Sequence, residues 1–178
     1  MHISATFQTP RVNMARFREA LHERLSEALV QGAFTWLATV VEEATSVGLP
    51  IWSAASIATF LPLARYVGMS LGSSPVAGAP DRTGLGIANG QATFDPGETT
   101  PGLYVFSYST TLPHLIVNEY YNANTFLNPK TGEPYFHLHH PGPYRFQEKG
   151  QAAFLRFAGG VELPGWSSIL DTATLRVG

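Results

Sequence analysis

The densest group of side chains that could do chemistry is the histidine cluster His137, His139 and His140. On an extended strand, His137 and His139 would point to the same side, as two ligands of a metal ion do. Glu133 or Glu148 could supply a third ligand. The cluster lies among prolines, however, and lacks the rigid helical spacing of a His-Glu-x-x-His site. The pattern therefore favours loop or interface histidines, with a metal-dependent hydrolase as the alternative.

A serine hydrolase is a second form of this alternative. Ser107 or Ser109 would be the nucleophile, His114 the general base, and Asp95 or Glu119 the acid that orients the base. The chain contains no Gly-x-Ser-x-Gly nucleophile elbow. Serine, histidine and acidic residues also fall within such short distances by chance, so His114 is better explained as a polar turn residue after a proline.

Three glycines, Gly84, Gly86 and Gly90, are spaced somewhat like those of a phosphate-binding loop. The segment lacks the Lys-Ser/Thr ending of a nucleotide loop and the full dinucleotide fingerprint. A tight turn or a glycine within a strand is the simpler interpretation. The sequence therefore predicts no cofactor.

Aromatic residues are concentrated in the second half of the chain, where they could stack on nucleic-acid bases. Only Lys130 and Arg145 fall between Arg82 and Lys149, so basic side chains are too sparse for a nucleic-acid surface. Many aromatics with few lysines are typical of a protein core or an interface. An aromatic pocket in a ligand-binding domain is the third alternative. The aromatic residues of this second half include Tyr104, Phe106, Tyr108, Tyr120, Tyr121, Phe126, Tyr135, Phe136, Tyr144 and Phe146.

The composition is that of a folded chain with an unusually uncharged surface. The chain has 178 residues, enough for one domain with a sizeable core. Hydrophobic residues make up 44% and charged residues 13%, and the latter is about half the usual share of roughly 25%. The net charge of −2 provides no overall basic field for nucleic acid. The chain contains no cysteine, which excludes disulfides, thiolate metal sites and a cysteine nucleophile.

No basic segment followed by an apolar run opens the sequence, so we expect no secretory signal and folding in a cytoplasm. The sequence contains no run of about 18 apolar residues, so it predicts no membrane-spanning helix. We therefore expect no membrane partner.

The elements that must position these residues begin with a predicted short strand at 3–7 and a helix at about 11–46. Thr9 and Pro10 are a suitable helix start, and Gly48 a suitable end. Apolar residues recur every three or four positions along the helix. Charges are frequent in its first half and sparse in its second, which we expect to be covered by the fold, by a neighbouring subunit, or by both. The apolar positions are Met14, Phe17, Leu21, Leu25, Ala28, Gly32, Trp36, Val40 and Ala44.

The remaining segments indicate an α+β domain over residues 1–178, with a long N-terminal helix packed on an antiparallel sheet and a second, C-terminal helix. The pattern leaves strand and helix open for residues 49–68. A strand pair is predicted at 84–94 and 103–110 around a turn at 95–98, a helix at 145–157 and a strand at 172–177. Residues 115–121 form an apolar and aromatic segment. Long loops are expected near 70–83 and 122–143.

Three further segments, besides the long N-terminal helix, carry a resemblance. Residues 45–56, Thr-Ser-Val-Gly-Leu-Pro-Ile-Trp-Ser-Ala-Ala-Ser, are similar to a Pro-Val-x-Thr/Ser-Gly-x-x-Arg-x-Ser segment, with Ala54-Ala55 in place of the glycine and Ile57 or Ala58 in place of the arginine. Residues 108–120 are similar to a Tyr-x-x-x-Val-Glu-Tyr/Phe strand. Residues 142–150 are similar to a closing helix. Together the chain resembles the neck and tail-completion proteins of tailed bacteriophages over about residues 11–158.

This resemblance implies a non-enzymatic α+β virion subunit in an oligomeric ring at the head–tail junction, acting as a neck, tail-completion or tail-terminator protein. Its partners would be further copies of the chain, neighbouring portal or adaptor proteins, and tail-tube proteins. DNA would pass transiently and without sequence specificity through the ring. Assembly would take place in the host cytoplasm.

The expected functional residues are then aromatic interface residues rather than catalytic groups or metal ligands. The candidates are Trp36, Trp52, Phe60, Tyr120, Tyr121, Tyr144 and Phe146.

Overall fold

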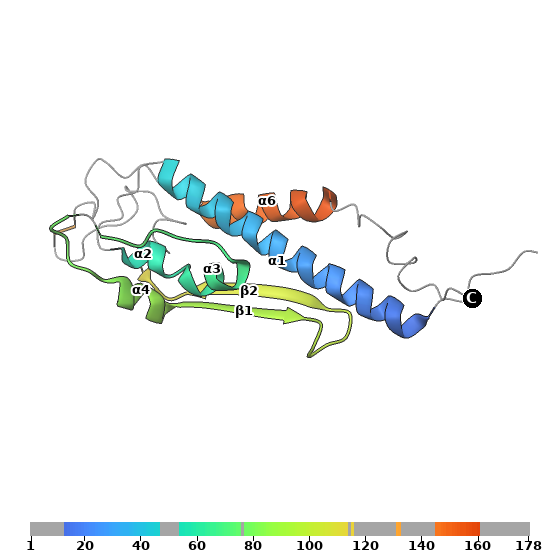
Figure 1. Ribbon diagram of the computed structural model, residues 1–178. Helices are drawn as coiled ribbons and strands as arrows, with labels where there is room; N and C mark the ends of the chain where they lie inside the picture. The colour runs from blue at the N-terminus through green and yellow to red at the C-terminus, as the bar shows by residue number, and fades with distance from the viewer. Residues whose placement is uncertain are drawn as a thin grey trace, which may run out of the picture.

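The computed structural model describes residues 13–46, 54–75, 77–113, 115, 131–132 and 145–160. In chain order the elements are α1 (Met14–Ser46), α2 (Ala55–Ala58), α3 (Leu61–Val67), α4 (Thr83–Asn89), β1 (Gly90–Pro96), β2 (Tyr104–Thr110) and α6 (Phe146–Gly160). A long N-terminal helix, a two-stranded antiparallel sheet and a C-terminal helix confirm the predicted α+β class (Figure 1).

Several predicted segments lie outside the described residues. These are the strands at 3–7 and 172–177, residues 116–121, and nearly all of the loop at 122–143. Within the loop predicted at about 70–83, residues 70–75 and 77–82 contain no helix or strand.

Helix α1 begins at Met14, three residues later than predicted, because Asn13 caps it. The Asn13 Oδ1 atom accepts hydrogen bonds from the backbone N–H groups of Ala15 and Arg16, at 3.1 and 3.2 Å. These bonds satisfy two of the donors that every helix leaves unpaired at its start. The helix then runs for 33 residues, or about 50 Å at 1.5 Å per residue.

The open choice for residues 49–68 is resolved as helix over the described part, where α2 and α3 follow each other. Pro62 lies at the start of α3, where its missing N–H costs nothing, and Gly68 ends the helix with a left-handed φ of 68°. Ala54, before α2, is also left-handed, with φ of 58°.

The strand prediction at 84–94 is wrong in its first half. Residues 83–89 form α4, which begins where the backbone N–H of Thr83 donates to Asp81 Oδ1 at 2.9 Å. Hydrogen bonds to the backbone and to the side chain of Thr83 lower the pKa of Asp81. The glycines explain the packing: an added Cβ at Gly86 would lie 2.1 Å from Ala55 O, and one at Gly90 would lie 2.0 Å from Thr59 O. They allow close backbone contact rather than phosphate binding.

The hairpin itself follows the prediction. β1 pairs with β2 in the register Gly90 with Thr110 through Pro96 with Tyr104. At the predicted turn, Asp95 Oδ1 accepts the backbone N–H groups of Glu98 and Thr99, at 2.9 and 3.3 Å. One face of the hairpin lies towards the core, and the other carries mainly hydroxyl and amide side chains.

The core lies where α1, α3, the inner face of the hairpin and α6 meet. Trp36 is at its centre, with ring centroids 5.6 Å from Tyr108 and 6.3 Å from both Phe60 and Phe106. Such tilted and edge-on aromatic pairs add to the stabilisation that comes from burying apolar area. The core is therefore built largely from aromatic side chains.

Helix α6 packs antiparallel to the second half of α1 through glycines on both helices. A Cβ at Gly32 of α1 would lie 2.6 Å from the Phe154 ring, and a Cβ at Gly150 of α6 would lie 2.8 Å from Val40 Cγ2. Lys149 also pairs with Glu43 at this interface. The predicted helix at 145–157 is thus confirmed, and it covers only the C-terminal half of α1 (Figure 1).

Candidate binding groove

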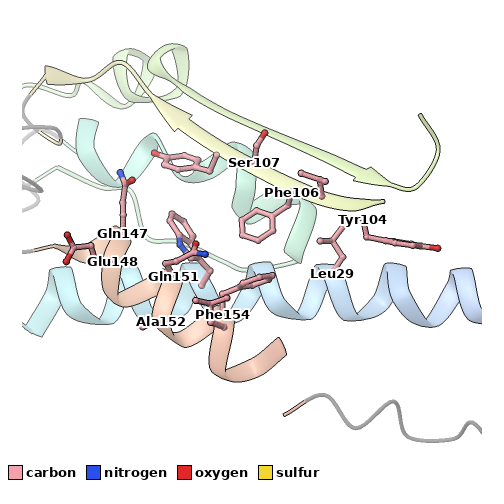
Figure 2. A pocket seen from close by; sticks show the side chains of 13 residues that line it. Leu29, Tyr104, Phe106, Ser107, Gln147, Glu148, Gln151, Ala152 and Phe154 are labelled. Carbon is pink, nitrogen blue, oxygen red and sulfur yellow. The ribbon is translucent and has the colours of Figure 1, made fainter. Parts of the chain in front are cut away.

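A groove of about 760 Å³ lies between β2 and α6, above the second half of α1. One wall is formed by β2 residues 104–108 and the other by α6 residues from Gln147 to Leu155, while Leu29 and Trp36 of α1 form the floor. Figure 2 shows Phe106 and Phe154 pointing into this space from the two walls. Their rings meet edge-on, with centroids 5.4 Å apart. The groove is thus an extension of the aromatic core to the surface.

The alternation along β2 produces the first wall. Tyr104, Phe106 and Tyr108 are partly buried, whereas Val105, Ser107 and Ser109 are exposed on the outer face. This is the period-two pattern of a strand with one face towards the core. The aromatic side chains therefore lie towards α1 and α6, and the backbone of β2 forms the rim.

Tyr108 is held at the inner end of the groove by a hydrogen bond to a buried threonine. Its hydroxyl donates to Thr59 Oγ1 at 2.8 Å, and Thr59 Oγ1 donates in turn to Ser56 O, also at 2.8 Å. Burial raises the pKa of Tyr108 to about 12, with the hydrogen bonds to Thr59 and Thr110 opposing that shift. The tyrosine is therefore a neutral, positioned part of the wall at neutral pH.

The backbone of β2 has one edge paired with β1 and a second edge that is open in the part of the chain the structure describes. The N–H of Thr111 donates to Asn89 O at 3.0 Å, which makes these residues a hydrogen-bonded pair. In an antiparallel ladder such pairs alternate with non-bonded pairs. It follows that the N–H and C=O groups of Tyr104, Phe106 and Tyr108 point to the open edge. Pro96, which has no N–H, occupies such a non-bonded position opposite Tyr104.

Helix α6 contributes the polar side of the groove through Gln147, Glu148 and Gln151. Glu148 is the one carboxylate among the lining residues, and it lies 3.4 Å from Arg145 in a pair that is exposed on both sides. Such an exposed pair contributes little to stability. An apolar floor, amide side chains and a row of backbone groups suit an extended peptide better than a small charged substrate.

The residues of the hydrolase alternative are not brought together in the described part of the chain. Ser107 and Ser109 lie on the outer face of the hairpin, and Ser107 Oγ is 2.6 Å from Thr93 Oγ1. Asp95 holds the turn. His114, Glu119 and Glu133 lie outside the described residues, as does the whole His137–His140 cluster.

His22 is the only histidine whose surroundings the structure describes. Its Nδ1 atom is 2.8 Å from the Tyr104 hydroxyl, at the outer end of the groove. Over the described ranges, no three histidine or acidic side chains are grouped as metal ligands.

Three of the aromatic interface candidates are core residues of this chain. Trp36, Phe60 and Phe146 expose only 6, 7 and 4% of their surface. A side chain so enclosed by its own chain offers almost no area to a partner, so these three are removed from the interface set. Trp52, Tyr120, Tyr121 and Tyr144 lie outside the described residues.

Sequence reasoning missed the groove, although its two walls carried a signal. The alternation of residues 104–108 predicted the strand, and the spacing of Phe146, Gly150 and Phe154 predicted the helix face. Neither pattern shows that β2 and α6 lie side by side, because that depends on how both pack against α1.

Comparisons with protein-family models, with curated proteins and with solved structures find no match for this chain. Among the described helices, none combines the length and the apolar character needed to cross a bilayer.

Proposed function

We propose that this chain is a non-enzymatic structural subunit of a tailed-phage virion, which assembles with further copies into a ring at the head–tail junction. The ring would surround the channel through which DNA passes, next to portal or adaptor proteins and tail-tube proteins. The observation that carries the proposal is an apolar stripe on α1 that continues beyond the end of α6.

The stripe follows from the different lengths of the two helices. α6 has 15 residues, or about 22 Å, and lies against the second half of α1. In that half, Gly32 and Trp36 are buried, the former directly beneath Phe154. The same helix face continues towards the N-terminus through Ala28, Leu25, Leu21 and Met14.

These four residues are not buried by the described part of the chain. Met14 exposes 56% of its surface, and Leu21, Leu25 and Ala28 are each partly exposed. An apolar row on a projecting helix is typical of a surface that another chain covers. A contact between this helix and a different surface of the next copy would be heterologous, which is the type of contact that closes a ring.

Two further features support the proposal. Charged residues make up only 13% of the chain, which suits a subunit whose flanks are covered in an assembly. In addition, Ala54 has a left-handed φ of 58°, a conformation that favours glycine, and it lies where the resembling phage segment has its glycine.

Light scattering of the purified protein over a range of concentrations and salt is the first test. We expect a closed oligomer or an association that salt does not weaken, because an apolar contact is not screened. Leu21→Glu should shift the mass towards the monomer. Arg16→Gln is the matched control, since it lowers the net charge by the same amount at an exposed position on the opposite face of α1.

Circular dichroism should show that Leu21→Glu remains folded, because Leu21 is not part of the core. A chain that stays monomeric throughout, with Leu21→Glu indistinguishable from the unaltered protein, would contradict the proposal.

A further inference from the structure

The open edge of β2 is the feature of the groove that calls for a specific occupant. Tyr104, Phe106 and Tyr108 direct a regular row of backbone donors and acceptors towards the groove, beside an apolar floor. A two-stranded sheet with an exposed edge is a template for one more strand. A segment that binds there must be extended, apolar on its inner side and polar on its outer side.

The required pattern occurs in the chain at residues 172–177, Thr-Ala-Thr-Leu-Arg-Val. In an extended conformation Ala173, Leu175 and Val177 share one side and the other three residues share the opposite side. The apolar side matches the groove. The polar side matches the outer face of the hairpin, which consists mainly of hydroxyl and amide side chains, among them Gln91, Thr93, Ser107 and Ser109.

The place where α6 ends makes this segment able to reach the groove. α6 runs opposite to β2: Phe154 meets Phe106, and the helix continues to Gly160 beside the end where β2 begins. Residues 161–171 then provide eleven residues, which span up to about 36 Å when extended. This is enough for the chain to turn after α6, so that residues 172–177 can begin beside Tyr104 and run in the same direction as β2.

The other alternating segment, residues 3–7, reaches the groove less easily. From Asn13 the chain would have to run back along the first half of α1, about 22 Å from Met14 to Leu29 at 1.5 Å per residue. Residues 8–12 span at most about 18 Å even when fully extended, at about 3.6 Å each, which is less than this distance.

We infer that residues 172–177 of the same chain bind in the groove between β2 and α6 as a third strand, parallel to β2. Two parallel neighbouring strands are usually joined by a helix, and α6 would be that helix between β2 and residues 172–177. The inference concerns a single copy of the chain, so it does not depend on the assembly of a ring.

Amide hydrogen exchange of the full-length protein, kept monomeric by Leu21→Glu and followed by NMR, tests the pairing residue by residue. The amides of Tyr104, Phe106 and Tyr108 should exchange about 100-fold more slowly than in Leu175→Asp, which places a charge on the inner side of the segment. Thr174→Asp is the matched control, because it adds the same charge on the outer side and should leave these amides slow. The amides of Val105 and Ser109, which pair with β1, should not change in either variant.

Disulfide cross-linking identifies the occupant, and the absence of native cysteine makes it clean. Gln151→Cys with Leu175→Cys should form an intramolecular disulfide that preserves the monomer mass, whereas Gln151→Cys with Thr174→Cys should not. Slow amides together with this cross-link support the inference. A disulfide between two copies, or a cross-link from Ala5→Cys in place of Leu175→Cys, would overturn it. So would amides of Tyr104, Phe106 and Tyr108 that exchange as fast in the unaltered segment as in Leu175→Asp.

Discussion

The two halves of α1 have the same conformation and a continuous apolar row, yet their surroundings differ completely. In the C-terminal half, Leu37 is fully buried and Ala33 and Val40 expose at most 1% of their surface. In the N-terminal half, no residue from Met14 to Ala28 is buried by the described part of the chain. Figure 1 shows the N-terminal end of α1 extending past α6 and the hairpin. A periodic apolar pattern therefore identifies the face of a helix that can be covered, but not what covers it.

The difference matters because burial, rather than helix propensity, supplies most of the stability of a helix in a protein. The covered half combines buried side chains with close helix contact at Gly32 and Gly150. The projecting half has its cap at Asn13 and the contact between His22 and Tyr104. We therefore expect the halves to differ in their contribution to the free energy of unfolding.

The largest expected effect contrasts a leucine in each half. Leu37→Ala should lower the free energy of unfolding by about 3 kcal/mol, because it leaves a cavity in the core. Leu21→Ala should cost less than about 1 kcal/mol in the dilute monomer, because its site is partly solvated. Urea unfolding of both variants measures the difference, and equal losses would break the comparison between the halves.

Raising the pH should lower the free energy of unfolding through Tyr108, a residue of the groove wall against which Trp36 packs. The pKa of Tyr108 is about 12 in the folded state and about 10 in an unfolded chain, so the folded state holds the proton more tightly. The resulting stability is fully present below pH 10 and decreases by about 2 to 3 kcal/mol as the pH rises to 12.

Urea unfolding between pH 9 and 12 would show this decrease. Tyr108→Phe should abolish that part of the pH dependence. Tyr66→Phe should retain it, because Tyr66 is 55% exposed. Identical profiles for the two variants would show that burial of Tyr108 is not the cause.

A smaller effect tests whether close contact with α6 is what distinguishes the covered half. Gly150→Ala should lower the free energy of unfolding by about 2 kcal/mol. Its Cβ would lie 2.8 Å from Val40 Cγ2 and 2.9 Å from Trp36 Nε1, and neither of these side chains can move freely. Gly159→Ala, in the same helix with nothing within 4 Å, should stabilise the protein by up to about 1 kcal/mol through helix propensity. Thermal unfolding of the pair gives the sign directly, and a tolerated Gly150→Ala would argue against tight packing.

The smallest expected effect is at the projecting end. Asn13→Ala removes the helix cap, which is worth about 1 kcal/mol to the first turn. Since that turn lies far from the core, we expect faster amide exchange near Met14 and almost no change in the urea midpoint. A midpoint shift as large as that of Gly150→Ala would show that the two halves unfold as one unit.

Sequence reasoning located most elements because their signals are local. Alternation placed β2 at Tyr104–Thr110, and Asp95 with Gly97 predicted the turn that precedes it. The prediction failed at residues 84–89, where glycines that looked like strand or turn residues allow α4 to approach α2. That approach is a contact between distant backbones, which no local pattern contains.

The sequence by itself determined the α+β class, the apolar face of α1 and the inner face of the hairpin, because spacing alone decides which side chains share a side. Only the tertiary structure decided that α6 ends halfway along α1, that Trp36, Phe60 and Phe146 are core residues, and that a groove separates β2 from α6. These features depend on contacts between residues far apart in the chain, made where Gly32 and Gly150 let two helices come close. Apolar residues on the same face of the helix therefore belong to the core in one half and to the surface in the other.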